Sequence, residues 1–412
     1  MNDANSNTEM FRGYRWIALA SAVVLQICLG ATYAWAEFIE PLKSATGTHQ
    51  AGAQWPFSLF YAVFPLTITL QGFFPFRAPL HRMAVAGGIL FGLSWMLAGI
   101  GMADARWIAL CVGVFGGVGV GWVYLIPVHV AIAWFPRHKG LVTGIALAGF
   151  GGGAALVGGI ADRMFASWDW TIFRALQAFG AAFAILTGAA GFAMRPPRTD
   201  AGHGDRAETP APIPPPTVRD LIGDRVFRAL LLTMTAGLMT GLTIAANLKH
   251  MQGSSVSRGA SAVAVFALAN ALGRIIWGRC SDRFPIRRML ALNLWISSAL
   301  LVAAPLFMAG RASLLLFTGL MGLNYGGVLS MHPALVARQW GHTLLRRVYG
   351  LIFAAHFPAI LAPPIAGRLW ESMGTIHPVL CVCAALCVLG ARDIVRTSAS
   401  HSNSTSGAPK GT

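Results

Sequence analysis

The residues best suited to chemistry in this chain are an arginine and an asparagine inside an apolar stretch. Asn270 and Arg274 open the segment N-A-L-G-R-I-I-W-G-R-C-S-D-R-F-P-I-R-R-M, which ends at Met289. Arginine stays charged, and its planar guanidinium can donate two parallel hydrogen bonds to a carboxylate. A spacing of four residues places both side chains on one face of a helix. The pair predicts an anion site, in which Asn270 either hydrogen-bonds the anion or orients Arg274.

The composition around this pair is that of a membrane protein. Of 412 residues, 55% are apolar and only 11% charged, whereas soluble domains carry about 25% charged residues. If the segment crosses a membrane, Arg274 lies roughly 12 Å from its polar end, where an unpaired charge costs about 3 kcal/mol or more. A buried acid is one possible partner, but the acids found within the spans, Glu37 and Glu40, lie near one end of the first span. We therefore expect the partner to be an anionic substrate.

Apolar stretches long enough to cross a ~30 Å hydrocarbon layer recur along the chain. They predict an all-α membrane protein with twelve transmembrane helices in two pseudo-repeated six-helix bundles. The spans are expected at residues 14–40, 54–76, 83–103, 106–134, 139–161, 170–194, 224–248, 259–280, 287–310, 312–337, 346–369 and 374–395.

The remaining segments are polar. Residues 1–13 and 397–412 are predicted to be disordered tails, and the Pro-rich residues 195–223 form a linker between the bundles 14–194 and 224–396. The linker and most of the 31 Lys and Arg residues fall on one side of the spans, which predicts cytoplasmic termini in a multi-pass protein of the inner (plasma) membrane. Because these basic residues sit in short loops, the net charge of +16 does not indicate nucleic-acid binding.

The two halves resemble each other in sequence. F-R-A-P-L-H-R-M after the second span matches D-R-F-P-I-R-R-M after the eighth, and K-G-L-V-T-G in the fifth span matches Y-G-L-I-F-A in the eleventh. Repeated halves are typical of transporters that bind substrate between two bundles near the membrane midplane.

These motifs resemble the major facilitator superfamily over nearly the full chain. G-R-C-S-D-R-F-P-I-R-R follows the loop signature of that superfamily between spans eight and nine. The segment W-F-P-R-H-K-G-L-V-T-G-I-A-L-A-G-F-G-G-G, the tripeptide Y-A-W, N-x-x-x-R with W-G-x-x-S-D, and R-V-Y-G are similar to its oxalate/formate antiporter and monocarboxylate porter branch. The resemblance implies alternating-access transport of a small carboxylate.

This chain departs from the pattern at three positions. Phe76 stands where the repeat has Asp282, so one gating loop lacks its carboxylate. The oxalate branch has a lysine at the position aligned with His356, and proton-coupled monocarboxylate porters typically have an aspartate in the helical turn of Asn270. These departures disfavour doubly charged oxalate and place any proton coupling on another group.

Three histidines inside spans are candidates for that coupling. His356 lies at a depth comparable with Arg274, where a bound carboxylate would favour its protonated form; the alternative is a neutral histidine bonded to a backbone carbonyl. His129 and His332 lie nearer the cytoplasmic ends of spans four and ten. We list all three as proton-coupling candidates and His356 also as a substrate ligand.

Three tyrosines are further candidates for substrate binding. Tyr124 and Tyr325 lie near mid-depth, at points where the branch has aromatic residues, and their hydroxyls can donate to a carboxylate. Tyr33 belongs to the Y-A-W match with Trp35, although interfacial aromatic belts also contain such residues.

Charged residues in the loop after span eight predict a conformational latch. Asp282, Arg283, Arg287 and Arg288 lie at the membrane surface, where we expect interhelical salt links that break as the halves rock.

Nothing in the sequence indicates an enzyme, a cofactor or a metal site. The six cysteines fall mostly in apolar spans without His or acid at ligand spacing, and the glycine-rich runs lack the G-K-[ST] of a phosphate loop. We expect a monomeric secondary transporter of small organic anions, most plausibly monocarboxylates, that acts with protons or a counter-anion in a lipid bilayer. An oxalate/formate-type exchanger, a drug-efflux protein and a non-transporting anion sensor are the alternatives.

Overall fold

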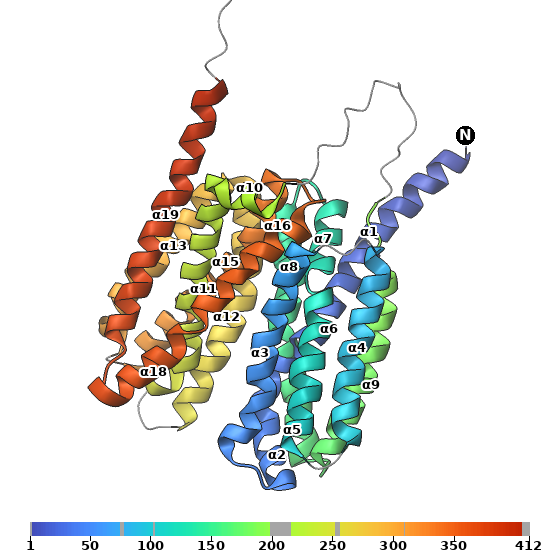
Figure 1. Ribbon diagram of the computed structural model, residues 1–412, viewed down its shortest axis with the longest axis vertical. Helices are drawn as coiled ribbons and strands as arrows, with labels where there is room; N and C mark the ends of the chain where they lie inside the picture. Colours follow the sequence, from blue (N-terminus) through green and yellow to red (C-terminus); the bar gives the residue numbers. More distant parts are fainter. Residues whose placement is uncertain are drawn as a thin grey trace, which may run out of the picture.

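The computed structural model describes residues 2–74, 78–101, 104–197, 216–251, 256–308 and 310–405. These residues form helices and their connections, in two groups that lie side by side (Figure 1). The first group consists of α1 (Asn2–Leu29), η1 (Gly30–Phe38), α2 (Ile39–Thr46), α3 (Gln50–Phe73), α4 (Leu80–Ile100), α5 (Ala105–Ile108), η2 (Ala109–Phe115), α6 (Gly116–Val123), α7 (Leu125–Trp134), α8 (Lys139–Ala166) and α9 (Ile172–Phe192).

The second group follows the linker. It consists of α10 (Val218–Gly223), α11 (Arg225–Met251), α12 (Val256–Arg283), α13 (Ile286–Val302), α14 (Ala304–Phe307), α15 (Arg311–Gln339), α16 (Leu345–Ile352), η3 (Phe353–Ala355), α17 (His356–Ala359), α18 (Ala362–Met373) and α19 (His377–Thr405). We call the two groups the first and second halves.

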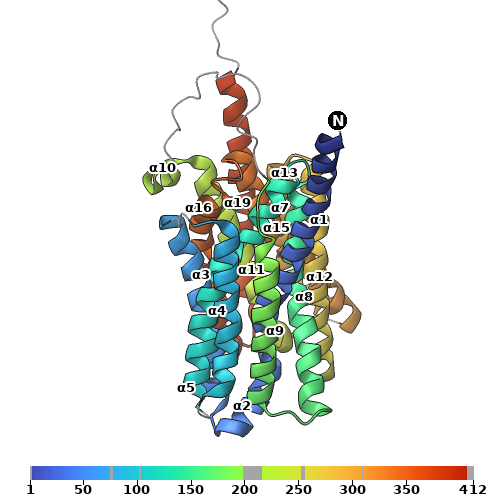
Figure 2. The ribbon, with the colours of Figure 1, turned by 90° about the vertical axis from the view of Figure 1, so that its right-hand side faces the viewer.

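The described residues contain ten helices that are long and apolar enough to cross a membrane. The two further expected spans are α12 and α13: α12 carries several polar and basic residues, and α13 is only 17 residues long. With them, the described residues supply six crossings in each half. The long helices run along a common axis (Figure 2). The predicted all-α, twelve-helix fold is thus the observed one.

Segments outside the expected spans are partly helical. α1 begins at Asn2 and α19 continues to Thr405, although the sequence predicts disordered tails there. Within the expected linker lies the short helix α10, whose N-cap residue Thr217 forms a capping box with Asp220. The rest of that linker, residues 198–215, and the tail residues 406–412 lie outside the described residues.

Three crossings are interrupted near the middle of the molecule. The first crossing winds as a 3₁₀ helix through η1, the fourth breaks at Tyr124 between α6 and α7, and the eleventh passes through the 3₁₀ turn η3. Pro127 contributes to the break in the fourth crossing, because its ring nitrogen cannot donate to a preceding carbonyl. Tyr33, Tyr124, Phe353 and His356 therefore sit on or beside irregular helical turns.

Glycines bring the two halves together at the face where α1 begins and α19 ends, which we call the terminal face (upper in Figure 1). A Cβ on Gly140 would overlap the carbonyl oxygen of Gly278, and a Cβ on Gly144 would overlap that of Arg274. Two turns further along α8, a Cβ on Gly151 would have Ala271 Cβ as its nearest neighbour, at 3.8 Å. Helices α8 and α12 are therefore pressed together at the terminal face and separate toward the opposite face.

Candidate functional site

Arg274 lies on α12 at the point where the two halves meet, with only 3% of its surface exposed. Its Nε donates to Asn270 Oδ1 at 3.1 Å, and its Nη1 donates to the backbone carbonyl of Leu147 on α8. The guanidinium therefore bridges the second half and the first. The amide oxygen of Asn270 accepts from the guanidinium, which is compatible with the orienting role; a hydrogen bond from Asn270 to an anion stays a prediction.

No carboxylate balances this charge in the described part of the chain. The ion pairs found there are Lys43–Glu40 and Arg338–Asp282, and neither involves Arg274. The two oxygens that accept from Arg274 are both neutral. The site therefore holds a permanent cation whose counter-charge does not come from these residues.

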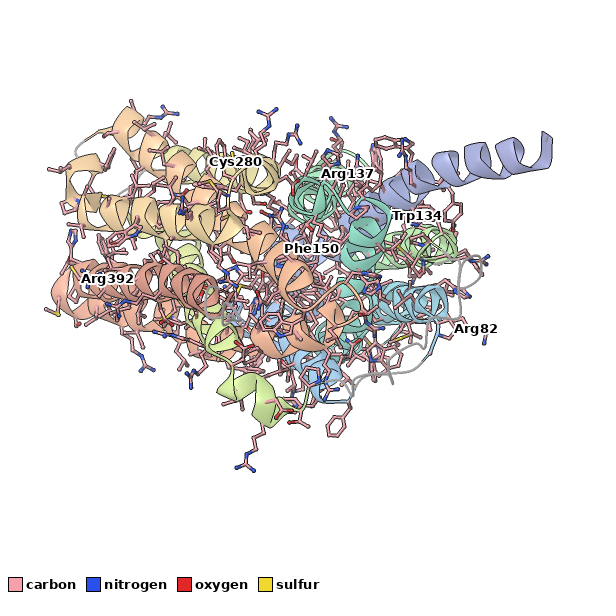
Figure 3. All side chains as sticks on the ribbon, turned by 90° about the horizontal axis from the view of Figure 1, so that it is seen from above. Arg82, Trp134, Arg137, Phe150, Cys280 and Arg392 are labelled. Carbon is pink, nitrogen blue, oxygen red and sulfur yellow. The ribbon has the colours of Figure 1, made fainter. Side chains whose placement is uncertain are left out.

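An aromatic cluster lies beside Arg274 and closes the space between the halves. It consists of Phe64 on α3, Tyr124, Phe150 on α8 and Phe353 in η3, each at most 3% exposed. Tyr124 lies 5.1 Å from Phe64, 5.2 Å from Phe150 and 5.6 Å from Phe353, measured between ring centroids. Seen from the terminal face, Phe150 lies near the centre of the molecule, far from Arg82 and Arg392 at its ends (Figure 3). We call these four rings the aromatic floor.

Partly exposed residues from both halves surround this floor. Tyr33 contacts Phe150 at 5.1 Å and Tyr61 at 5.4 Å, yet 40% of its surface is exposed. Asn270, Tyr325 and His356 are partly exposed too. Because α8 and α12 separate beyond the floor, we infer that these groups face the opening between the halves.

Four tyrosines lie within electrostatic range of the Arg274 charge. They are Tyr33, Tyr124, Tyr325 and Tyr349. Tyr325 also stacks on Phe266, with ring centroids 5.9 Å apart. Trp35, by contrast, is 1% exposed and donates to the Ala53 carbonyl at 2.9 Å, so it packs in the core rather than in an interfacial belt.

His356 joins the floor from the second half. Its ring stacks on Phe353 with centroids 4.1 Å apart, and its Nδ1 lies 2.9 Å from the Phe353 carbonyl oxygen. A carbonyl oxygen only accepts, so Nδ1 carries the proton and Nε2 of the neutral ring is an acceptor. Among the described residues, no hydrogen bond or ion pair joins His356 to Arg274.

The other two histidines lie closer to the terminal face. His332 is fully buried in the second half, with Nε2 2.9 Å from the Thr233 hydroxyl and Nδ1 2.7 Å from the Val328 carbonyl. The contact with Thr233 thus joins α15 to α11, while the contact with Val328 lies within α15. His129 on α7 is also buried, but its Nδ1 has no hydrogen-bond partner among the described residues.

Asp282 forms a contact between the halves at the terminal face. Its two oxygens accept from the backbone amides of Gly140 and Leu141, both at 2.8 Å, at the start of α8. Arg338 pairs with the same carboxylate at 2.8 Å. A carboxylate stabilises a helix N-terminus because the free amides there carry partial positive charge.

The three arginines predicted to act with Asp282 have other surroundings. Arg287 donates to the Thr397 carbonyl at 2.9 Å and to Gln339 Oε1 at 2.7 Å, which ties α13 to α19 and α15 inside the second half. Arg283 and Arg288 are exposed and form no hydrogen bond or ion pair with the described residues. Among the four predicted latch residues, only Asp282 hydrogen-bonds to the described part of the opposite half.

Comparison with known proteins decides the family. A profile described as the Major Facilitator Superfamily matches residues 17–253 and 239–410. The chain belongs to this superfamily. It is 25% identical over 363 residues to the "Oxalate:formate antiporter" of Oxalobacter formigenes, covering 83% of this chain and 82% of that protein.

Two further comparisons cover almost the whole transporter. The "Apicoplast pyruvate carrier 1" of Toxoplasma gondii is 22% identical over 493 residues, covering 93% of this chain and 89% of the carrier. The crystal structure of FucP, a Major Facilitator Superfamily transporter in the outward conformation, superposes with a TM-score of 0.67 at 14% identity. It covers 92% of this chain and 99% of FucP, which shows the shared fold. The predicted family resemblance is therefore confirmed.

Sequence reasoning missed several residues of this transporter's site. Phe64, Phe150 and Phe353 of the aromatic floor, with Tyr61 and Tyr349, were not among the candidates. Tyr349 is 1% exposed, and its hydroxyl has no partner among the described residues. The repeat was a usable signal, because Phe64 occupies the position in α3 that corresponds to Asn270 in α12.

Proposed function

We propose that this protein is a secondary transporter of small organic anions, with monocarboxylates as its main substrates, and that Arg274 binds the carboxylate. The positive charges near the terminal face favour a cytoplasmic position for it in the inner (plasma) membrane. In that orientation the halves are closed on the cytoplasmic side, and the partly exposed groups above the floor are reached from outside. Alternating access then requires the contacts at the terminal face to open.

One observation carries this proposal: the uncompensated burial of Arg274. A charged side chain in the membrane interior costs about 3 kcal/mol or more, and such residues usually mark a substrate path. The carbonyl of Leu147 and the amide of Asn270 solvate the guanidinium but leave its net charge in place. A substrate carboxylate would add charge-assisted hydrogen bonds and neutralise it.

The surrounding residues support a small, singly charged substrate. Tyr33, Tyr124 and Tyr325 provide hydroxyl donors within range of the same charge, while Phe64 and Phe353 provide apolar walls. One fixed cation matches one carboxylate. The names of two relatives, which refer to oxalate, formate and pyruvate, support small carboxylates in the same way.

The coupling mode has two candidates. His356 supports proton symport, because the free Nε2 of its neutral ring can take a proton when an anion binds nearby. The relative named as an oxalate:formate antiporter supports exchange of anions. Counterflow into proteoliposomes, with and without a pH gradient, separates the two. Proton symport predicts that His356→Gln loses accumulation driven by external acid, and accumulation that persists in this variant would exclude His356.

The decisive test compares ligand stabilisation of the wild-type protein and Arg274→Ala. We expect formate, pyruvate or lactate to raise the melting temperature of the wild type and to leave Arg274→Ala unchanged, with uptake reduced about 100-fold because the charge-assisted bonds are lost. Arg279→Ala is the matched control, since Arg279 lies on the same helix outside the site. Equal carboxylate responses in wild type and Arg274→Ala would refute the proposal.

The same assay addresses two other functions. A non-transporting anion sensor would show ligand stabilisation but no flux in proteoliposomes. Drug efflux would show stabilisation by organic cations. Binding a cation requires an acid deep in the membrane, whereas Glu37 in the first crossing is exposed.

A further inference from the structure

Two histidines from opposite halves meet at the terminal face. His129 on α7 belongs to the first half, and His342, between α15 and α16, belongs to the second. Their ring centroids are 5.7 Å apart, with the planes inclined by 60°. His129 is 8% exposed and His342 is partly buried, so the two rings pack within the closed contact.

A permanent cation approaches the same point. Arg346 at the start of α16 acts electrostatically on His129, as does His342. The guanidinium of Arg346 itself crosses to the first half, where it donates to Gln71 Oε1 at 3.1 Å and approaches Met83 Sδ at 3.5 Å. Arg346 is thus fixed beside the histidine pair by neutral groups.

Among the side chains that the structure describes, the elements packed against α7 add no free carboxylate. Asp282 is already engaged by the amides at the start of α8 and by Arg338. The other described titratable or charged side chains at the neighbouring ends of α1, α8, α15 and α16 are tyrosines and bases, namely Tyr14, Arg15, Lys139, His332, Arg338, Arg346, Arg347 and Tyr349. Protonation of the pair would therefore place like charges close together, with no compensating acid among these described side chains.

We propose that His129 and His342 form a pH-sensitive switch in the contact between the halves, and that protonation of the pair opens the terminal face. With both rings neutral, the pair packs in the closed state. With both charged, it repels across the contact and repels Arg346, and separation of the halves relieves this repulsion. By linkage, acid on this side shifts the population toward the state open at the terminal face.

Few interactions hold His129 in the closed contact. Its Nδ1 is buried without a hydrogen-bond partner among the described residues. In the open state that nitrogen would reach water. Because water solvates a charged ring better than the buried contact does, acidification favours the open state. The switch rests on the alternating-access part of the proposed function but not on the identity of the substrate.

The test measures the gate directly in the full-length protein. Spin labels at Arg137→Cys in the first half and Arg288→Cys in the second report the distance across the terminal face in nanodiscs, in a background without native cysteines. Both arginines are exposed. We expect acidification from pH 7.5 to 5.5 to raise the ratio of separated to closed molecules by about tenfold.

Histidine variants identify the groups responsible. His129→Gln and His342→Gln should each lose most of this response, and the double variant should lose all of it. His138→Gln is the matched control, because His138 is exposed at the same face and should leave the response intact. A wild-type distance distribution that does not change with pH would overturn the proposal, as would a response that survives in the double variant.

The distance measurement stays interpretable if one variant does not fold or if the protein does not transport carboxylates. If His129→Gln does not fold, His342→Gln still tests the pair from a partly exposed loop position. Since no substrate is present, a failure of carboxylate transport leaves the distance measurement interpretable. Conversely, carboxylate transport by a protein whose terminal face does not respond to pH would contradict the switch and leave the proposed function standing.

Discussion

Two helix crossings with glycines at their centre join the halves at the terminal face, and they differ in chemistry. Helix α12 crosses α8 at Gly278 and Gly140, and helix α3 crosses α16 at Gly72 and Gly350. The repeat places Gly72 and Gly278 at corresponding positions, and likewise Gly140 and Gly350. The same backbone approach between the halves therefore occurs twice, once for each pair of repeat-related helices.

The side chains on these crossings are not equivalent. On α12, Asn270, Arg274 and Asp282 bond to the opposite half or to each other, through charges. The corresponding residues of α3 are Phe64 and Ile68, of which Phe64 packs on Phe353 at 5.6 Å. The residue that corresponds to Asp282, Phe76, lies outside the described residues. One crossing thus offers charged groups for which a bound anion can compete, while the other is a mainly apolar seam.

The difference suggests that substrate acts on one crossing only. A carboxylate at Arg274 would compete with the Leu147 carbonyl for the same guanidinium, which would weaken a bond between α12 and α8. Ligand binding shifts a conformational equilibrium only through such differential contacts. The described side chains of the α3–α16 seam include no charged group at the same depth. A bound carboxylate would therefore not weaken this crossing directly.

The largest expected effect comes from filling the glycine crossings. Gly140→Ala places a Cβ against the carbonyl oxygen of Gly278, so two backbones must move apart, whereas a Cβ on Gly350 would lie 2.9 Å from the Ile68 carbonyl. We expect Gly140→Ala to destabilise the closed state by about 3 kcal/mol and Gly350→Ala by about 1 kcal/mol. The Arg137/Arg288 spin-label pair measures both shifts. Equal shifts would show that the two crossings contribute equally to the stability of the closed state.

A smaller effect is expected at Asp282. Asp282→Asn keeps one acceptor but removes the charge that stabilises the start of α8 and pairs with Arg338. Arg338 is about a third exposed, so water can solvate its charge once the ion pair is lost. The closed state should therefore lose only about 2 kcal/mol. The measurement is again the fraction of separated molecules. As a control, Arg283→Gln changes a neighbouring charge without a described partner and should have no effect.

The fold was predictable because the bilayer imposes it. Apolar stretches of sufficient length, a repeat between halves and one loop motif were enough to predict twelve crossings and the superfamily. Arg274 was predictable for the same reason, since a charge within an apolar span stands out in sequence. Asp282 was also identifiable, as it lies in the motif.

Other parts of the site follow from packing that a single sequence does not encode. Phe64, Phe150 and Phe353 are ordinary apolar residues in apolar spans, and only the crossing of four helices makes them a floor. Arg287 looks equivalent to Asp282 in the loop motif, but its reach toward α19 and α15 places its bonds within one half. The proximity of His129 to His342 depends on how close the halves approach, which no spacing along the chain specifies.

The smallest expected effect is at Arg346, the polar contact on the α3–α16 seam. Arg346→Gln removes a hydrogen bond to Gln71 Oε1 at 3.1 Å and a weak approach to Met83, neither of which involves an acid. A single bond of this kind contributes about 1 kcal/mol. The variant also removes a cation beside His129, so its closed state should tolerate acid better than the wild type. The spin-label ratio at pH 7.5 should therefore rise slightly, while its increase on acidification should shrink. A loss at pH 7.5 as large as that of Asp282→Asn would mean that the two crossings are energetically alike, and the asymmetry between them would then have to lie in Arg274 alone.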